Sequence, residues 1–196
     1  MKLIISTTSP YSRKCRVMVR ELGLAGQVEE VEAHPFDDDP DLLSANPLGR
    51  VPCLMMDDGQ ALTESALIAD YIAEQAGDPW PRDWNDRRLE ALGNGLLDLT
   101  VMRRVEMVRD EGIRSDFWIG RRERGILRAL DELEAGMGEV DNPMAQGPLT
   151  MAVALSYLDF RYPESHWREN RPQLQALAEA WSARPSFQAT RPPADG

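Results

Sequence analysis

A serine-containing turn follows the first apolar run of the chain. Residues 9–12 read Ser-Pro-Tyr-Ser, with Ser9 placed to cap a helix and Pro10 at the first helical position. Unpaired backbone N–H groups and the positive end of a helix dipole favour an anion at such a helix start. A serine there cannot exchange disulfides, but it can donate a hydrogen bond to a thiolate. A plain helix cap is the alternative that these residues leave open.

A second segment, Asn46 to Leu54, puts a proline at the entry to a strand. Pro52 has no N–H group and therefore loses one hydrogen bond of the ladder. One explanation is a cis peptide bond that turns the backbone of Val51 outward, where its N–H and C=O groups could pair with an extended peptide ligand. An ordinary proline on an edge strand is the other explanation.

The third segment is Thr63-Glu64-Ser65-Ala66, which opens another helix. The hydroxyl and N–H groups of Ser65 at a helix N-terminus suit a carboxylate, and the charge of Glu64 suits an ammonium group. Together they could hold the zwitterionic head of an amino acid. A simple helix start again remains possible.

The elements that must position these segments alternate in type over the first 76 residues. We expect strands at 2–6, 28–33, 53–56 and 60–62, and helices from Ser9 to the cap at Gly23 and from 63 or 64 to 76. Asp57-Asp58-Gly59 is a hairpin signal between the last two strands. Cys15, Met18, Val19 and Leu22 form one apolar helical stripe, with Arg13, Lys14 and Arg16 off it. This order predicts an α/β domain with a mixed sheet covered by helices.

The rest of the chain has a helical texture. Residues 78–81 interrupt both periods and indicate a linker. Leucines at 89, 92, 96 and 99 and apolar residues at 126, 130, 133 and 137 follow helical spacing, and further helices are expected at 150–160 and 172–183, after a loop at 142–148. We therefore predict an α/β domain over 1–77 and an all-α domain over 82–196.

The composition excludes several classes of function. A net charge of -11 makes nucleic acid an unfavourable partner, because its phosphates would be repelled. We expect no membrane association, since no apolar run approaches the roughly 20 residues of a membrane helix. Cys15 and Cys53 match no metal-ligand spacing, so no metal is expected, and a reducing cytoplasm suits both thiols.

The three segments, in this order and spacing, resemble the glutathione-binding site of the glutathione S-transferase superfamily. The similarity covers nearly the whole chain, and 157–161 and 184–190 resemble a bacterial subfamily. The resemblance implies a thioredoxin-like domain, an all-α domain, glutathione between them and a homodimer. Its transferases make a glutathione thiolate that attacks a small electrophile.

The resemblance also implies a role for each site residue. Ser9 would face the glutathione sulfur, with Ser12 as the second candidate for the catalytic hydroxyl. The backbone of Val51, beside a cis Pro52, would pair with the cysteinyl part of glutathione. The remaining assignments are Glu64 and Ser65 to the γ-glutamyl head and Arg50 to the glycine carboxylate. The electrophile would lie against 96–107, where Arg103 and Arg104 could contact a polar substrate.

One segment departs from the family pattern. Many transferases begin a buried helix with a capping box that contains aspartate, whereas Thr150 is followed by Val153 at that place. Either this helix is short or a stretch of the sequence is absent, which leaves the boundaries between 140 and 152 open.

Three other functions are alternatives to a transferase. A non-catalytic binding or regulatory protein of the same fold would have lost the site, but all three segments are intact. A glutaredoxin-like or omega-type thiol enzyme needs a cysteine at Ser9. A maleylacetoacetate isomerase usually has Ser-Ser-Cys in this turn, which residues 9–12 do not match.

Overall fold

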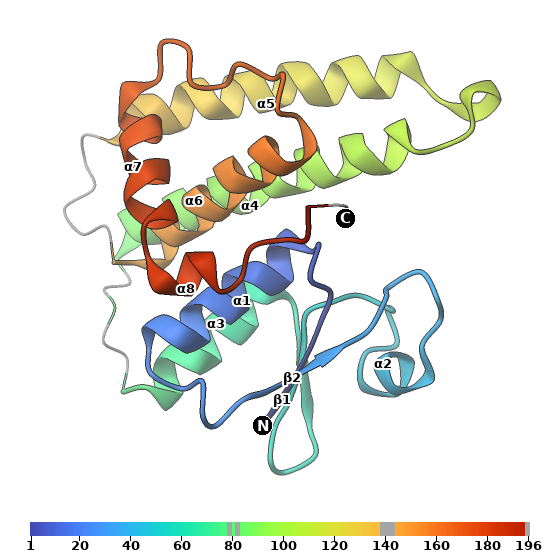
Figure 1. Ribbon diagram of the computed structural model, residues 1–196, viewed down its shortest axis with the longest axis vertical. Coiled ribbons are helices and arrows are strands. Elements are labelled where there is room, and N and C mark those ends of the chain that lie inside the picture. Colours follow the sequence, from blue (N-terminus) through green and yellow to red (C-terminus); the bar gives the residue numbers. More distant parts are fainter. Residues whose placement is uncertain (78–79, 81–82, 138–143, 195–196) are drawn as a thin grey trace. The chain divides into compact units, whose positions relative to one another are not determined.

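The computed structural model describes residues 1–77, 80, 83–137 and 144–194 (Figure 1). They divide into two compact units, one formed by Met1–Trp80 together with Ala183–Gly196, the other by Pro81–Ser182. Most of the predicted linker at 78–81 and the first residues of the loop at 142–148 lie outside the described residues.

The first unit is built on a four-stranded mixed sheet of order β2-β1-β3-β4. Its strands are β1 (Lys2–Ile5), β2 (Glu29–Glu32), β3 (Cys53–Met55) and β4 (Ala61–Thr63). β1 pairs with β2 in parallel and with β3 antiparallel, and β3 pairs antiparallel with β4. The predicted mixed sheet is confirmed.

Helices cover both faces of this sheet. They are α1 (Pro10–Glu21), α2 (Pro40–Ala45) and α3 (Ser65–Gln75), and the short α8 (Pro185–Gln188) packs against α1. Figure 1 shows α1 and α3 together on one side of the sheet and α2 on the other. On the α2 side, Leu42 packs in a core with Ile4 and Cys53. Strand neighbours point to opposite faces, so Leu3 and Ile5, both buried, face α1 and α3.

Helices are the regular secondary structure among the described residues of the second unit. It contains α4 (Trp84–Met107), the 3-10 turn η1 (Glu111–Ile113), α5 (Asp116–Gly136), α6 (Gln146–Arg161) and α7 (Pro172–Ser182). α4 packs along α5 and α6, and α7 packs against α5 and α6. The thioredoxin-like plus all-α architecture is therefore the one that the sequence predicted.

Helix α6 starts earlier than predicted. It begins at Gln146 and runs for 16 residues, so the loop prediction for 146–148 and the short-helix alternative are wrong. Pro148 is tolerated because the first turn of a helix leaves its N–H groups unpaired anyway. In place of a local capping box, Asp86 of α4 accepts a hydrogen bond from the N–H of Gly147 at 2.8 Å. Thr150 lies inside the helix, bonded to the carbonyl of Gln146.

Candidate functional site

The Ser9 hydroxyl lies at the start of α1, directly after β1. Ser9 is the N-cap residue of this helix, and its Oγ accepts a hydrogen bond from the N–H of Ser12 at 3.2 Å. Its own N–H donates to the carbonyl of Ser6 at 3.1 Å. Ser9 is only half-buried. Because its Oγ is used as an acceptor, the hydroxyl proton remains available to a group outside the helix.

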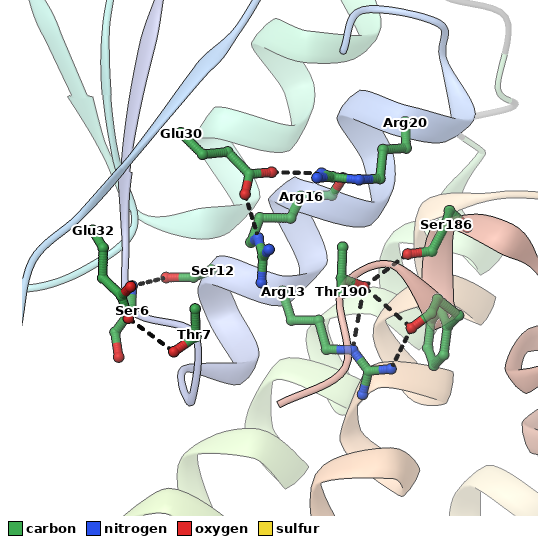
Figure 2. A network of polar contacts seen from close by, with 11 residues as sticks. Ser6, Thr7, Ser12, Arg13, Arg16, Arg20, Glu30, Glu32, Ser186 and Thr190 are labelled. Atoms are coloured by element: carbon green, nitrogen blue, oxygen red, sulfur yellow. Dashed lines mark hydrogen bonds and ion pairs between the residues drawn. The ribbon is translucent and has the colours of Figure 1, made fainter. Parts of the chain in front are cut away.

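Ser12 has a different environment. It is fully buried, and its Oγ accepts a hydrogen bond from the N–H of Ser6 at 3.3 Å (Figure 2). The Ser6 hydroxyl in turn bonds that of Thr8. The structure thus places Ser12 inside the turn and Ser9 at its surface.

The charged residues of α1 lie in its interior and are held by partners. The first turn contains no acidic residue. Arg16 and Arg20 both bind the carboxylate of Glu30 on β2, the former at 2.8 Å (Figure 2). Burial opposes the charged form of Glu30, yet the two guanidinium groups hold its pKa below the usual value. Burial, with Arg16 and Arg191 nearby, lowers the pKa of Arg13 to about 10.

The Val51–Pro52 peptide bond is cis, as the sequence suggested. Among the described residues, no hydrogen bond reaches the N–H or C=O group of Val51. The preceding loop is held by the buried Asn46, whose amide donates to the carbonyl of Arg50 at 2.8 Å and accepts from the N–H of Leu48 at 3.1 Å. This anchoring role was not predicted, although Asn before Pro is a turn signal.

Glu64 and Ser65 mark the start of α3. Glu64 is exposed and has a φ of 71°, a backbone conformation that residues other than glycine rarely adopt. Ser65 is the first helical residue and is 6% exposed. The thiol of Cys15, on α1, lies 3.7 Å from the carbonyl of Ser65. Cys15 is buried in the predicted apolar stripe, and this contact adds a link between α1 and α3.

The sheet register brings the three segments to one end of the sheet. Ile4 lies opposite Cys53 on β3, and Cys53 lies opposite Thr63 on β4. The turn after β1, the Val51–Pro52 bond before β3 and the Glu64–Ser65 pair after β4 therefore share one end of the sheet. Arg50 adjoins them and is exposed, with no carboxylate of the described residues within ion-pair distance.

The predicted electrophile contacts belong to the second unit. Arg103 stacks over the ring of Tyr162, with 4.2 Å between its guanidinium carbon and the ring centroid, and lies 3.2 Å from Glu123. Arg104 is half-buried on the same helix. Arg103 is thus held by its own unit, which the sequence pattern alone did not indicate.

The described residues contain neither a membrane-spanning helix nor a cluster of metal-ligating side chains. No helix among them is both long and apolar enough to cross a bilayer. Within the same residues, no three His, Cys, Asp or Glu side chains gather as a metal ion would require.

The sequence and the fold match known proteins along most of the chain. Residues 3–80 match the family described as the N-terminal domain of glutathione S-transferases. The uncharacterized GST-like protein YibF of Escherichia coli (strain K12) is 33% identical over an alignment 204 residues long, gaps included, that covers 98% of this chain and 99% of YibF.

Solved structures also match over nearly the whole chain. A glutathione transferase family member from Pseudomonas fluorescens Pf-5, with bound glutathione, is 37% identical with a TM-score of 0.92 over 98% of each chain. A second structure from that strain, with bound S-(propanoic acid)-glutathione, is also 37% identical, with a TM-score of 0.87 over 98% of this chain and 100% of the other. On this identity, coverage and fold, the chain belongs to the glutathione S-transferase superfamily.

Proposed function

We propose that the chain is a glutathione transferase of the bacterial serine type. Ser9 stabilises the glutathione thiolate, which then attacks a small electrophile. The observation that carries the proposal is the half-buried Ser9 at the N-terminus of α1, with its Oγ bonded to the N–H of Ser12. That bond orients the hydroxyl and leaves its proton for the sulfur.

The energy required is within the reach of these groups. Lowering a thiol pKa from about 8.5 to about 6.5 takes roughly 2.7 kcal/mol of preferential thiolate stabilisation. A hydrogen bond to a charged group contributes about 1.5–3 kcal/mol, and a helix N-terminus adds about 0.3–1 kcal/mol. Ser9 and the start of α1 therefore suffice without a metal or a general base.

The remaining site residues hold the tripeptide. Ser65 and Glu64 at the start of α3 receive the γ-glutamyl carboxylate and ammonium groups. The N–H and C=O groups of Val51, beside Pro52, pair with the cysteinyl backbone, and Arg50 binds the glycine carboxylate. The bound glutathione in the Pseudomonas fluorescens relative supports glutathione as the ligand.

The reaction forms one S–C bond. The thiolate supplies the electron pair, and the electrophile either releases a leaving group with its bonding pair or takes a proton from water after addition. We infer that the enzyme acts as a homodimer in the cytoplasm, as the resemblance implies, and that it removes reactive electrophiles.

The test separates binding from activation. Calorimetric titration with reduced glutathione is expected to show binding in the wild type and in Ser9→Ala, and a large loss in Ser65→Ala. With an activated aryl halide as electrophile, Ser9→Ala should lower kcat/KM by about 10- to 150-fold, the equivalent of one hydrogen bond to a charged group.

Two outcomes would contradict the proposal. Absence of heat and of thermal stabilisation by glutathione would favour a binding or regulatory protein whose site has been lost. Unchanged activity in Ser9→Ala, with activity abolished in Ser12→Ala, would show that Ser9 is not the catalytic hydroxyl.

A further inference from the structure

The C-terminal segment of the chain packs against α1. Residues from Ala183 onward belong to the first unit, and α8 contacts α1 within it (Figure 1). We name residues 183–190 the C-terminal strap. It holds α1 at two points, one near each end of the helix.

The first point is at the C-terminal end of α1. The carboxylate of Glu21 accepts a hydrogen bond from the Nε of Arg184 at 2.8 Å and another from the hydroxyl of Ser186. The side chain of Glu21 is 8% exposed. The hydrogen bond from Arg184 is the main cause that lowers the pKa of Glu21, with Ser186 acting in the same direction against burial.

The second point is in the first turn of α1. The buried Arg13 donates from Nη2 to the carbonyl of Phe187 at 3.1 Å and from Nε to the hydroxyl of Thr190 at 3.5 Å (Figure 2). Its guanidinium carbon lies 4.3 Å from the centroid of the Phe187 ring. Thr190 also donates to the carbonyl of Ser186 at 2.8 Å, which fixes the strap at this point.

Arg13 connects this second point directly to Ser9. The N–H of Arg13 donates to the carbonyl of Ser9 at 3.0 Å and so closes the first turn of the helix. A displacement of Arg13 therefore moves the residue whose hydroxyl faces the ligand. Misplacement of a catalytic group by about 1 Å can lower a rate by about 100-fold.

We propose that Arg13 is a positioning residue for Ser9 and that the C-terminal strap holds it in place. This inference rests on the proposed function, since it assigns to the strap the orientation of the same catalytic hydroxyl. Arg184 binds Glu21 at the other end of α1, so it contributes to stability without setting the position of Ser9.

The experiment compares Arg13→Met with Arg184→Met in the full chain. For each variant we would measure Tm, the Kd for glutathione, kcat with an activated aryl halide, and the pKa of the bound thiol from thiolate absorbance. Arg13→Met is expected to lower kcat by about 10- to 100-fold and to raise the thiol pKa, with little change in Kd. Arg13→Lys, which keeps one donor for the carbonyl of Phe187, should restore part of kcat.

Arg184→Met supplies the control. It should lower Tm at least as much as Arg13→Met while kcat and the thiol pKa stay at the wild-type values. If both variants lose only Tm, the strap is structural and the inference is wrong. If the wild type itself does not lower the thiol pKa of bound glutathione, the proposed function fails instead.

Discussion

Ser9 and Ser12 carry the same side chain but occupy opposite environments. Ser9 is only half-buried at the helix start, whereas Ser12 is fully buried and its hydroxyl accepts from the N–H of Ser6. A reacting thiolate needs a donor that it can reach, and a buried turn needs its N–H groups satisfied. The geometry therefore favours Ser9 for chemistry and Ser12 for the integrity of the turn.

The two roles predict different effects of substituting each serine by alanine. Ser12→Ala leaves the N–H of Ser6 buried without a partner, so we expect the free energy of unfolding to fall by about 1–3 kcal/mol. The catalytic rate should fall less than in Ser9→Ala, because the N–H of Ser12 still bonds the Ser9 hydroxyl. Urea denaturation and steady-state kinetics on both variants test this. A Ser12→Ala protein of full stability and no activity would instead identify Ser12 as catalytic.

The backbone of Glu64 gives a second prediction at this scale. Its φ of 71° is easy for glycine and unfavourable for a residue with a Cβ. Glu64→Gly should therefore be more stable than Glu64→Ala by about 1 kcal/mol. Both lack the carboxylate, so both should bind glutathione more weakly, by the same factor. Equal stabilities of the two variants in urea denaturation would show that the conformation is not strained.

Helices and strands with a clear local pattern were predictable from the sequence. β1, α1, the β3–β4 hairpin and α3 depend on apolar periodicity and on capping residues, and each lies within two residues of its predicted bounds. The short helices α2 and α8 were missed, because six and four residues give no helical period to detect. The early start of α6 was missed because its stabilising partner, Asp86, is on another helix.

The local structure of the candidate site was predictable where the signal lies within one segment. The serine turn, the proline before β3 and the start of α3 each have a local signal. The contact between Cys15 and Ser65 and the hydrogen bonds of Arg13 to the strap join residues far apart in sequence. Such contacts depend on the tertiary fold, so no local pattern indicates them. For the same reason, the burial of Arg13, Lys14 and Arg16 does not follow from the helical stripe.

The close packing of α6 on α4 gives a prediction at the element scale. A Cβ on Gly147 would lie 2.8 Å from the carbonyl oxygen of Asp86 and 2.9 Å from the Cβ of Leu89. Gly147→Ala should therefore destabilise the protein by about 1–3 kcal/mol. Gly95, inside α4, has no atom within 4 Å of such a Cβ, so Gly95→Ala should stabilise by about 0.5–1 kcal/mol. Urea titrations that show the same sign for both would refute the packing argument.

At the scale of the whole molecule, the path of the chain couples the two units. The chain builds most of the first unit, forms the second, and returns to the first through the C-terminal strap. If the second unit unfolded alone, an unfolded segment of roughly 100 residues would have both ends held by the first unit. Holding the ends of such a loop costs about 4 kcal/mol in entropy, which favours unfolding of both units together.

The chain contains a separate probe for each unit, which makes this coupling measurable. Cys15 and Cys53 are both buried in the first unit, so their reaction with a thiol reagent reports its unfolding. Four of the five tryptophans, at 84, 118, 167 and 181, lie in the second unit and dominate the fluorescence.

We expect the two probes to give the same urea midpoint in the wild type. An S-alkyl glutathione, which has no thiol to interfere, should raise both midpoints, because a ligand at 100 times its Kd stabilises by about 2.7 kcal/mol. In a variant with Arg13→Met and Arg184→Met together, the strap is released and the loop entropy is no longer lost. Its fluorescence midpoint should then fall below its cysteine midpoint. Two separate transitions already in the wild type would show that the strap does not couple the units.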